Sequence, residues 1–284
     1  MRYVLLFSLV LAYAFSPVTS KAGTFMAGAK YWYANWDSAI IDWFEKDIGG
    51  GFKTLGVELK SDIDTGSGYL AGPFFSYQSD GGNLAVSFAP MLFSSFSQDW
   101  TGMAGTMDLA TNLDTERKDV DFAIIYSLAE HQDKLSLFKY SKMFLGYKYQ
   151  TINYDLKLSY TTPMGPRTFD YELDAEVHMP TLGLGLVYPA YDKLAIGVQA
   201  GVGLALIDLE MKDPDGNTFD ISPSASISYN AEITGTYKTI DNLIFQLGYR
   251  YQVWYLRARS PQHWKETESE DITQGLTISF LYIF

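Results

Sequence analysis

Hydrophobic and polar residues alternate with a period of two along most of the chain, which predicts β-strands with one apolar and one polar face. The alternation is clearest over residues 273–284, where threonine, serine and glycine alternate with large apolar residues. The apolar face of this segment consists of Leu276, Ile278, Phe280, Tyr282 and Phe284. After residue 22 no window reaches the roughly 18 consecutive apolar residues that a helical membrane span needs, so we expect strands.

Ten such segments are predicted, and the links between them alternate between short and long. Four short polar links end in a leucine that opens a strand (Leu84, Leu135, Leu194 and Leu243), so these leucines are 51, 59 and 49 residues apart. The predicted strands are about 24–37, 68–79, 84–97, 117–128, 135–151, 177–188, 194–206, 223–237, 243–256 and 271–284. The predicted long loops are 38–67, 98–116, 152–175, 207–222 and 257–270. An eight-stranded sheet with one hairpin misread is the alternative.

The polarity of the strand faces suits a barrel that has lipid outside and a hydrated lumen inside. A soluble barrel would turn the small polar face outward, so the alternation alone does not decide between the two. The first 22 residues and the C-terminal strand, described below, favour a barrel in the membrane. We therefore predict an all-β, transmembrane, antiparallel up-and-down β-barrel over residues 23–284, closed by the C-terminal strand.

The first 22 residues have the layout of a secretory signal peptide. Arg2 precedes an apolar stretch over residues 3–15, and the small residues Ser20 and Ala22 mark the expected cleavage region. Thirteen helical residues rise only about 20 Å, which is short of the roughly 30 Å hydrocarbon core, so a membrane anchor is disfavoured. The signal peptide predicts export to the cell envelope.

The segment LTISFLYIF at the C-terminus resembles the terminal strand of bacterial outer-membrane barrels. In those proteins a final Phe preceded by alternating apolar residues is the assembly signal, which corresponds here to Phe280, Tyr282 and Phe284. The resemblance implies an outer-membrane location in a Gram-negative cell, recognition by the barrel-assembly machinery, and contact with outer-membrane lipids including lipopolysaccharide. An even number of strands places both termini in the periplasm.

Composition excludes several classes of protein. The chain is 47% hydrophobic and 16% aromatic, and its net charge of -12 disfavours binding to nucleic acid. It has no cysteine, so disulfides, zinc held by cysteine and thiol catalysis are excluded. With only three histidines we expect no metal site and no cofactor.

Charged residues on the polar faces are candidates for a network inside the lumen. The candidates are Lys30, Asp121, Lys148, Glu232 and Arg250. A hairpin centred near residue 240 is expected to place Asn230 opposite Arg250, with Glu232 one diagonal step away. We expect a structural network that plugs the lumen, because unpaired buried charges are costly. A selectivity filter or proton path is the alternative.

Three prolines (Pro73, Pro90 and Pro180) fall inside predicted strands, where each removes a hydrogen-bond donor. Lys139 falls on the nominal lipid face, which predicts a bulge or a longer turn there. Residues 38–51 predict a short helix over the barrel mouth, ended by Gly49–Gly51.

Ten strands, the loop lengths and short motifs resemble the omptins, a family of outer-membrane proteases. The motifs are Gln98-Asp99-Trp100 and the segments 178–184 and 191–197. In that family two aspartates sit two residues apart in the second outer loop, and an Asp-x-His pair sits in the fourth. Here Asp99 matches one acidic position, Ser97 occupies the other, and residues 206–215 contain no histidine. The comparison therefore implies an omptin-like scaffold without the base that would activate water.

Other acidic residues are weaker candidates for chemistry. Asp208 and Glu210 share a strand face and could replace the missing acidic pair. Glu176 and His178 are expected to point outward, whereas Asp119 and Asp121 are expected to point into the lumen. Residues 213–217 (DPDGN) have the oxygen spacing at which a calcium loop starts, but a simple turn is favoured.

Three functions remain after these exclusions. We rank a non-catalytic structural or surface-interaction barrel first, a narrow pore for ions or small solutes second, and an omptin-like protease or other surface hydrolase third. Neither a substrate nor a partner of the outer loops follows from the sequence.

Overall fold

The computed structural model describes residues 23–54, 59–63, 66–97, 100–104, 107–128, 140–162, 165–221, 225–240, 242–259 and 266–284. The proposed signal peptide and the residues around Lys139 lie outside the described residues.

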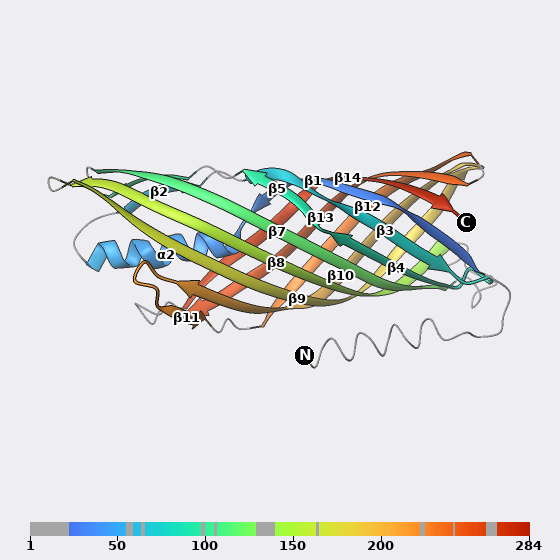
Figure 1. Ribbon diagram of the computed structural model, residues 1–284. Helices are drawn as coiled ribbons and strands as arrows, with labels where there is room; N and C mark the ends of the chain where they lie inside the picture. Colours follow the sequence, from blue (N-terminus) through green and yellow to red (C-terminus); the bar gives the residue numbers. More distant parts are fainter. Residues whose placement is uncertain are drawn as a thin grey trace.

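The described chain is almost entirely β-strand, with one helix (Figure 1). Its elements are β1 (Thr24–Asp37), α2 (Ala39–Thr54), β2 (Leu59–Ile63), β3 (Gly66–Gln78), β4 (Leu84–Met91), β5 (Phe93–Ser97), β6 (Trp100–Ala104), β7 (Met107–Ser127), β8 (Ser141–Thr162), β9 (Gly165–Tyr191), β10 (Leu194–Lys212), β11 (Thr218–Ile221), β12 (Ser226–Ile240), β13 (Leu243–Arg259) and β14 (Glu266–Ile283).

The strands form a closed antiparallel barrel. β1 pairs with both β3 and β14, and β7 pairs with both β4 and β8, so the ring has no open edge. β4, β5 and β6 follow one another at a single position of the ring, while β2 and β11 are additions that pair with β6 and β10. The barrel therefore has ten strands in up-and-down order. This confirms the ten-stranded prediction, and the eight-stranded alternative is wrong.

The strands begin where the sequence predicts but continue further at one end. β4, β10 and β13 start at Leu84, Leu194 and Leu243, as expected. The predicted loop 152–175, however, is mostly strand, because β8 and β9 stay paired as far as Thr162 and Gly165. The other predicted loops are shortened in the same way by the ends of β7, β10, β13 and β14. The parts of these strands that lie within the predicted loops are rich in polar residues, and from the sequence alone this composition predicts loops.

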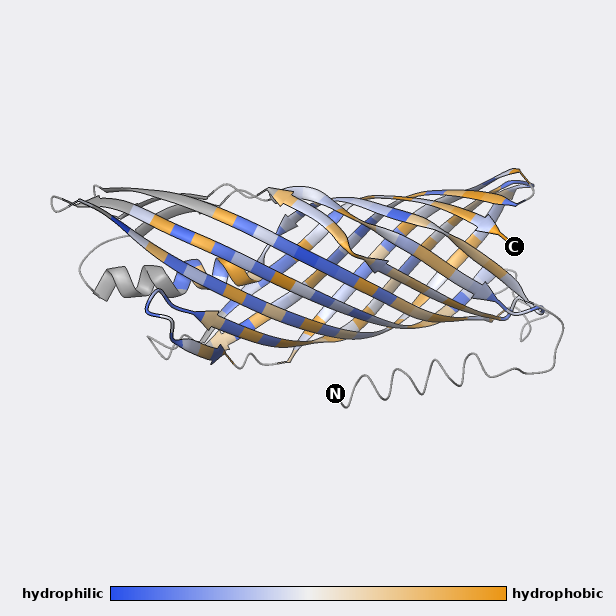
Figure 2. Ribbon diagram, viewed as in Figure 1, coloured by the Kyte–Doolittle hydropathy of each residue, from blue (hydrophilic) through white to orange (hydrophobic). Residues whose placement is uncertain are grey.

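One end of the barrel, here called the terminal half, holds Thr24 and Phe284, and its outer surface is apolar. Leu145, Leu184 and Val202 are outward-facing and 50–62% exposed. The residues that alternate with them are small or polar and face the lumen, such as Gly201 and Thr277. This is the polarity that lipid requires, and Figure 2 shows the apolar bands on these strands.

The other end, here called the hairpin half, holds α2 and the β8–β9 turn, and its polarity is reversed. Ile152, Leu173 and Leu209 face inward and are buried, whereas Asp155, Asp174 and Glu210 on the same strands face outward and are exposed. The prediction of an apolar outer face is therefore correct only for the terminal half. In the hairpin half the outer surface suits water, and the interior is a hydrophobic core.

α2 occupies the interior of the hairpin half (Figure 1). Ser38 caps its first turn, because its Oγ accepts a hydrogen bond from the Ile41 N–H and its carbonyl accepts one from Asp42 N–H. Phe44 is buried and packs edge-to-face on Tyr171 of β9, with ring centroids 5.2 Å apart. The helix runs on to Thr54, so the prediction that it ends at Gly49–Gly51 is wrong. Contact with β13, β14 and β2 outweighs the low helix propensity of glycine.

The three prolines lie within strands β3, β4 and β9, as predicted. The strand position shared by β4 and β5 is interrupted two residues after Pro90, at Leu92. Leu92 and Phe93 are both exposed there, as expected where an irregularity turns consecutive side chains to the same side.

Candidate functional site

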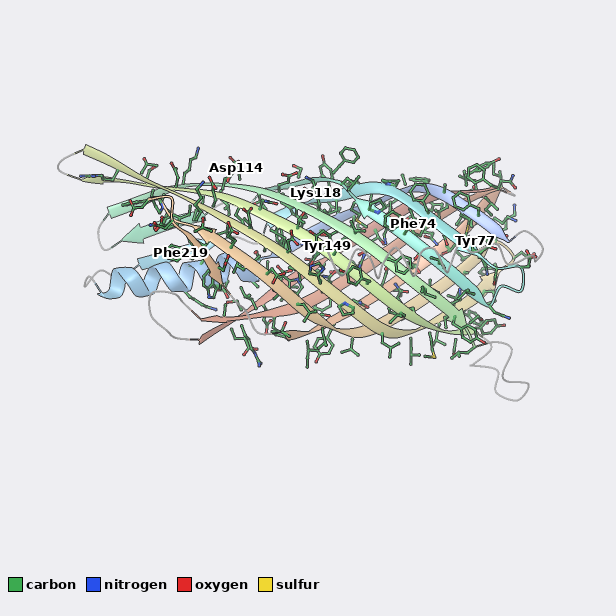
Figure 3. The ribbon with its side chains drawn as sticks, turned by 60° about the horizontal axis from the view of Figure 1, so that its bottom comes forward. Phe74, Tyr77, Asp114, Lys118, Tyr149 and Phe219 are labelled. Atoms are coloured by element: carbon green, nitrogen blue, oxygen red, sulfur yellow. The ribbon has the colours of Figure 1, made fainter. Side chains whose placement is uncertain are left out.

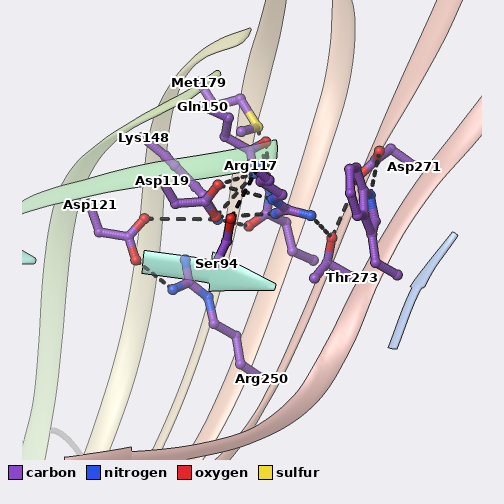
Figure 4. A network of polar contacts seen from close by, with 12 residues as sticks. Ser94, Arg117, Asp119, Asp121, Lys148, Gln150, Met179, Arg250, Asp271 and Thr273 are labelled. Atoms are coloured by element: carbon purple, nitrogen blue, oxygen red, sulfur yellow. Dashed lines mark hydrogen bonds and ion pairs between the residues drawn. The ribbon is translucent and has the colours of Figure 1, made fainter. Parts of the chain in front are cut away.

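A network of charged and polar side chains crosses the lumen where the two halves of the barrel meet (Figure 4). Its members come from four strands, and they face inward because they alternate with outward residues. They are Arg117, Asp119 and Asp121 of β7, Lys148 and Gln150 of β8, Arg250 and Gln252 of β13, and Asp271 and Thr273 of β14. All except Asp121, which is half-buried, are buried.

Asp119 is the centre of the network. The Arg117 guanidinium donates two hydrogen bonds to its carboxylate, from Nε at 3.0 Å and Nη2 at 3.1 Å. Gln150 Nε2 donates to both carboxylate oxygens at 3.0 and 3.1 Å, and Lys148 Nζ lies 2.6 Å from Oδ2. Two cations and an amide therefore stabilise one buried anion, which is the condition under which buried charge is tolerated.

Asp121 forms the second ion pair. Arg250 Nη1 on the far side of the lumen donates to its Oδ2 at 2.5 Å. Lys148 Nζ lies 3.9 Å from Asp121 Oδ1 and donates to Gln252 Oε1 at 2.7 Å. Lys148 therefore links both carboxylates and joins the β7–β8 wall to the β13 wall.

Trp32 of β1 completes the network with its aromatic face. Lys148 Nζ lies 5.0 Å from the centroid of this ring, and the guanidinium carbons of Arg250 and Arg117 lie 4.9 and 6.0 Å from it. Arg117 also lies 4.7 Å from the ring of Trp36. The negative faces of the indoles stabilise cations that outnumber the two central carboxylates.

The network continues into the hairpin half. Arg117 Nη1 donates to Thr273 Oγ1 at 2.9 Å, and Asp271 accepts a hydrogen bond from Trp36 Nε1 at 2.9 Å. Above this level the Ser38 hydroxyl and the Tyr154 hydroxyl are hydrogen-bonded, which ties the start of α2 to β8. The lumen is thus filled first by the charged network and then by the apolar core around α2.

The predicted lumen residues all face the lumen, but they are not equally connected. Asp121, Lys148 and Arg250 contact one another in the network. Glu232 lies below it, where it accepts hydrogen bonds from Gln199 at 3.1 Å and Thr277 at 3.4 Å. Lys30 points toward the Phe74 ring, 6.0 Å from its centroid.

The predicted register of the β12–β13 hairpin is wrong by two residues. Glu232 is directly opposite Arg250, and Asn230 is opposite Gln252. The midpoint of these pairs lies one residue later than expected, so each residue of β12 is opposite a β13 residue two positions further along the chain. The shift brings a carboxylate opposite the guanidinium.

Sequence reasoning did not select Arg117, Gln150, Gln252 or Trp32 as network members. Arg117 is the first residue of the predicted strand 117–128 and shares a face with Asp119 and Asp121, so the same alternation indicates that it points inward. For Gln150, Gln252 and Trp32 the sequence indicates only that the side chain points inward, and it does not indicate contact with the charged residues. Only closure of the barrel brings them to the same point.

The weak catalytic candidates do not form a site in the described residues. Asp208 and Glu210 are exposed on the outer wall, opposite Glu176 and Asp174 of β9. They point away from the core, whereas Asp99 lies outside the described residues.

His178 is on the same outer wall, as predicted for it and Glu176. Its Nδ1 is hydrogen-bonded to the Tyr147 hydroxyl at 2.6 Å, and its Nε2 lies 3.9 Å from Glu176 Oε2. Among the described residues no group of three or more histidine or carboxylate side chains could hold a metal ion.

Residues 213–217 form a turn rather than an open ring of oxygens. Asp213 Oδ1 accepts hydrogen bonds from the N–H groups of Asp215 and Asn217, and Oδ2 accepts one from Asn217 Nδ2. The Asn217 side-chain bond, followed by the backbone bonds, holds the pKa of Asp213 below its usual range. Both carboxylate oxygens of Asp213 therefore accept hydrogen bonds within the turn, in agreement with the simple turn that the sequence predicts.

The C-terminal strand closes the ring with its predicted apolar face outward. Phe284 N–H donates to the Phe25 carbonyl at 2.9 Å, and the two rings are 5.8 Å apart. Phe280 packs on Phe245 of β13, and Tyr282 packs on Phe284. Phe280, Tyr282 and Phe284 are all exposed on the terminal half.

Comparison with solved structures identifies the fold. The chain is similar to the outer membrane protease OmpT from Escherichia coli, with a TM-score of 0.53 and 13% identity over 93% of this chain and 99% of that chain. It also matches the translocator domain of the autotransporter NalP from Neisseria meningitidis (TM-score 0.47, 9% identity, 100% and 96% coverage) and the outer membrane protein OprG from Pseudomonas aeruginosa (TM-score 0.34, 12% identity, 93% and 97% coverage).

The fold is therefore that of a bacterial outer-membrane β-barrel, and it resembles the ten-stranded barrel of the omptin protease. Sequence comparison finds no matching protein-family model and no matching curated protein. No helix in the described part of the chain is long and apolar enough to cross a membrane.

Proposed function

We propose that this protein is a sealed, non-catalytic outer-membrane barrel whose hairpin half acts in structure or in interactions at the cell surface. The observation that carries the proposal is the filled lumen. Asp121, Lys148 and Arg117 contact Arg250, Gln252 and Thr273 on the opposite wall, and the apolar residues of α2 fill the space above them. A hydrated ion could pass only if paired buried charges separated, which costs several kcal/mol for each pair.

The orientation proposed for the barrel places both termini in the periplasm and the hairpin half outside the cell. The outer wall supports it, because Asp155, Asp174 and Glu210 need water rather than lipid around them. The proposed partners are the barrel-assembly machinery at the C-terminal strand, and outer-membrane lipids including lipopolysaccharide at the apolar wall. Replacing Phe284 by serine should lower the amount of heat-modifiable, folded barrel in the outer membrane. Undiminished assembly would contradict this role of the C-terminal strand.

Planar-bilayer recording tests the seal. Refolded wild-type protein should give no stable conductance steps. A variant that lacks residues 39–54 and carries Arg117→Ala, Lys148→Ala and Arg250→Ala should conduct, which shows that the assay detects inserted barrels. Discrete steps from the wild type would replace the proposal with a pore.

Whole-cell labelling tests the orientation. The chain has no cysteine, so Asp208→Cys provides a single thiol on the outer wall of the hairpin half. A membrane-impermeant maleimide added to intact cells should label it. Labelling only after the outer membrane is opened would invert the proposed orientation.

We also propose that omptin-type proteolysis is absent. Asp208 and Glu210 face outward rather than toward a shared cleft, and His178 is hydrogen-bonded to Tyr147 on the outer wall. A general base must reach its proton within about 3 Å, directly or through one water. Refolded protein with lipopolysaccharide should leave a dibasic peptide intact. Cleavage that is lost in Asp99→Ala would contradict the proposal and locate a site in the second loop.

A further inference from the structure

Among the described residues, side chains that face the lumen are buried in the hairpin half and reach solvent in the terminal half. In the hairpin half, inward residues such as Trp36, Ile152 and Leu256 are fully buried. In the terminal half, Gln199 is exposed although it faces inward, since its neighbours Val198 and Ala200 face outward. Gly185, opposite Gln199 on β9, is half-buried. Water therefore enters past the termini and stops at the charged network.

The terminal-half lumen carries more positive than negative charge. Lys30 of β1 and Lys142 of β8 both face inward, and neither forms an ion pair with another described residue. The acidic group on this side of the network is Glu232, which lies opposite Arg250 and accepts hydrogen bonds from Gln199 and Thr277. Neither lysine has a described carboxylate within ion-pair distance, although the charge of Lys30 also acts on the Asp121 carboxylate. Positive charge is therefore in excess beside water that is enclosed by a low-dielectric wall.

The space near Gln199 is not filled by the large side chain of the neighbouring strand. Phe144 of β8 lies over Gly183 and Gly201, where a Cβ would collide with its ring. At Gly185 a Cβ would meet only Val198 and Gln199, at 3.3 Å and beyond. The glycines under Phe144 therefore serve packing, and the lumen remains accessible next to them.

We propose that the terminal-half lumen is a blind recess that takes up small oxyanions from the side of the membrane that faces the termini. A recess in which one sign of charge is in excess within low-dielectric walls concentrates ions of the opposite sign. Lys30 and Lys142 supply this charge, and the network of Arg117, Asp119 and Lys148 ends the path. Under the orientation proposed above, the anions come from the periplasm.

Charge-selective labelling tests the recess. Gln199→Cys in the otherwise cysteine-free chain is treated with two methanethiosulfonates of similar size, one with a sulfonate and one with a trimethylammonium group. After correction for their rates with a free thiol, the anionic reagent should react about tenfold faster. Lys30→Gln with Lys142→Gln should bring the two rates together. Asp208→Cys, among the acidic residues of the outer wall, is the matched control and should prefer the cationic reagent.

Each outcome bears on a separate statement. Equal rates at Gln199→Cys, or a preference that persists without both lysines, would overturn anion uptake. A thiol that stays unreactive from the side of the termini would overturn the open recess. Labelling of Gln199→Cys from the hairpin side alone would overturn both the recess and the seal, whereas bilayer conductance tests the seal independently. Heat-modifiable mobility verifies that every variant is folded.

Discussion

The two halves of the barrel are built from the same strands but have opposite polarity. On β10, Val202 and Leu204 face outward in the terminal half, and after a few residues Asp208 and Glu210 take the outward positions. The backbone register with β9 continues across this change apart from one interruption near Leu204. The backbone geometry of the strand is therefore similar in both halves. The outward side chains alone make the wall suitable for lipid in one half and for water in the other.

The exterior of the barrel shows the same division from end to end. In Figure 3, Asp114 and Phe219 lie toward the α2 end and Tyr77 toward the opposite end. Tyr149 and Lys118 lie between them, close to where the outer surface changes from apolar to charged. Aromatic side chains such as Tyr149 suit such a boundary, because they have an apolar body and a polar tip.

The largest expected effect is at the junction between the halves. Arg117→Ala leaves Asp119 with one cation fewer in a fully buried position, so the free energy of unfolding should fall by about 3–5 kcal/mol. Lys118→Ala is the matched control, because Lys118 pairs with Glu116 on the exposed surface and should cost less than about 1 kcal/mol. Urea unfolding of the barrel in lipid vesicles measures both. Equal losses would mean that the network does not stabilise the junction.

A deletion within the hydrophobic core should affect the hairpin half selectively. Phe44→Ala removes a buried aromatic side chain from the contact with Tyr171 and should cost about 3–5 kcal/mol in that half. Amide exchange should increase along α2 and the outer part of β9, while the amides of Leu184 and Val202 remain protected. Uniform loss of protection would show that the two halves unfold as one unit.

A charge on the outer wall should distinguish the halves directly. Leu184→Lys places a cation on the lipid-facing wall and should cost about 2–4 kcal/mol. Asp174→Lys puts the same side chain on the same strand in the hairpin half, where a surface change is expected to stay within about 0.5 kcal/mol. Refolding yield into vesicles compares the two variants. A tolerated lysine at Leu184 would show that this wall is not in lipid.

The smallest effect concerns the turn at residues 213–217. Because the pKa of Asp213 is lowered, the stabilisation from its carboxylate is complete above about pH 4 and is lost as the pH falls through the folded-state value. Asp213→Ala should therefore speed amide exchange at Asp215 and Asn217 at neutral pH. Variant and wild type should converge in more acidic solution, and a difference that persists there would show that the protection does not depend on ionisation of the Asp213 carboxyl group.

The architecture of the terminal half follows from the amino-acid sequence alone. The alternation that lipid imposes identified all ten strands, and the opening leucines Leu84, Leu194 and Leu243 are the first residues of β4, β10 and β13. The outward faces of Tyr31 and Phe280 follow from the same rule. Lipid requires a continuous apolar surface, so every strand in this half must alternate. The position and the outward face of each strand can therefore be predicted from its own residues.

The hairpin half and the junction could not be predicted without the three-dimensional arrangement of the strands. Outside the lipid the polar face turns outward, so residues 152–175 resemble a loop although they are paired strands. The ion pair between Asp121 and Arg250 joins residues 129 positions apart, and Trp32 meets three cations from three other strands. These contacts form because β1 pairs with β14 and closes the barrel. The alternation of residues within one strand does not indicate which side chains closure brings together.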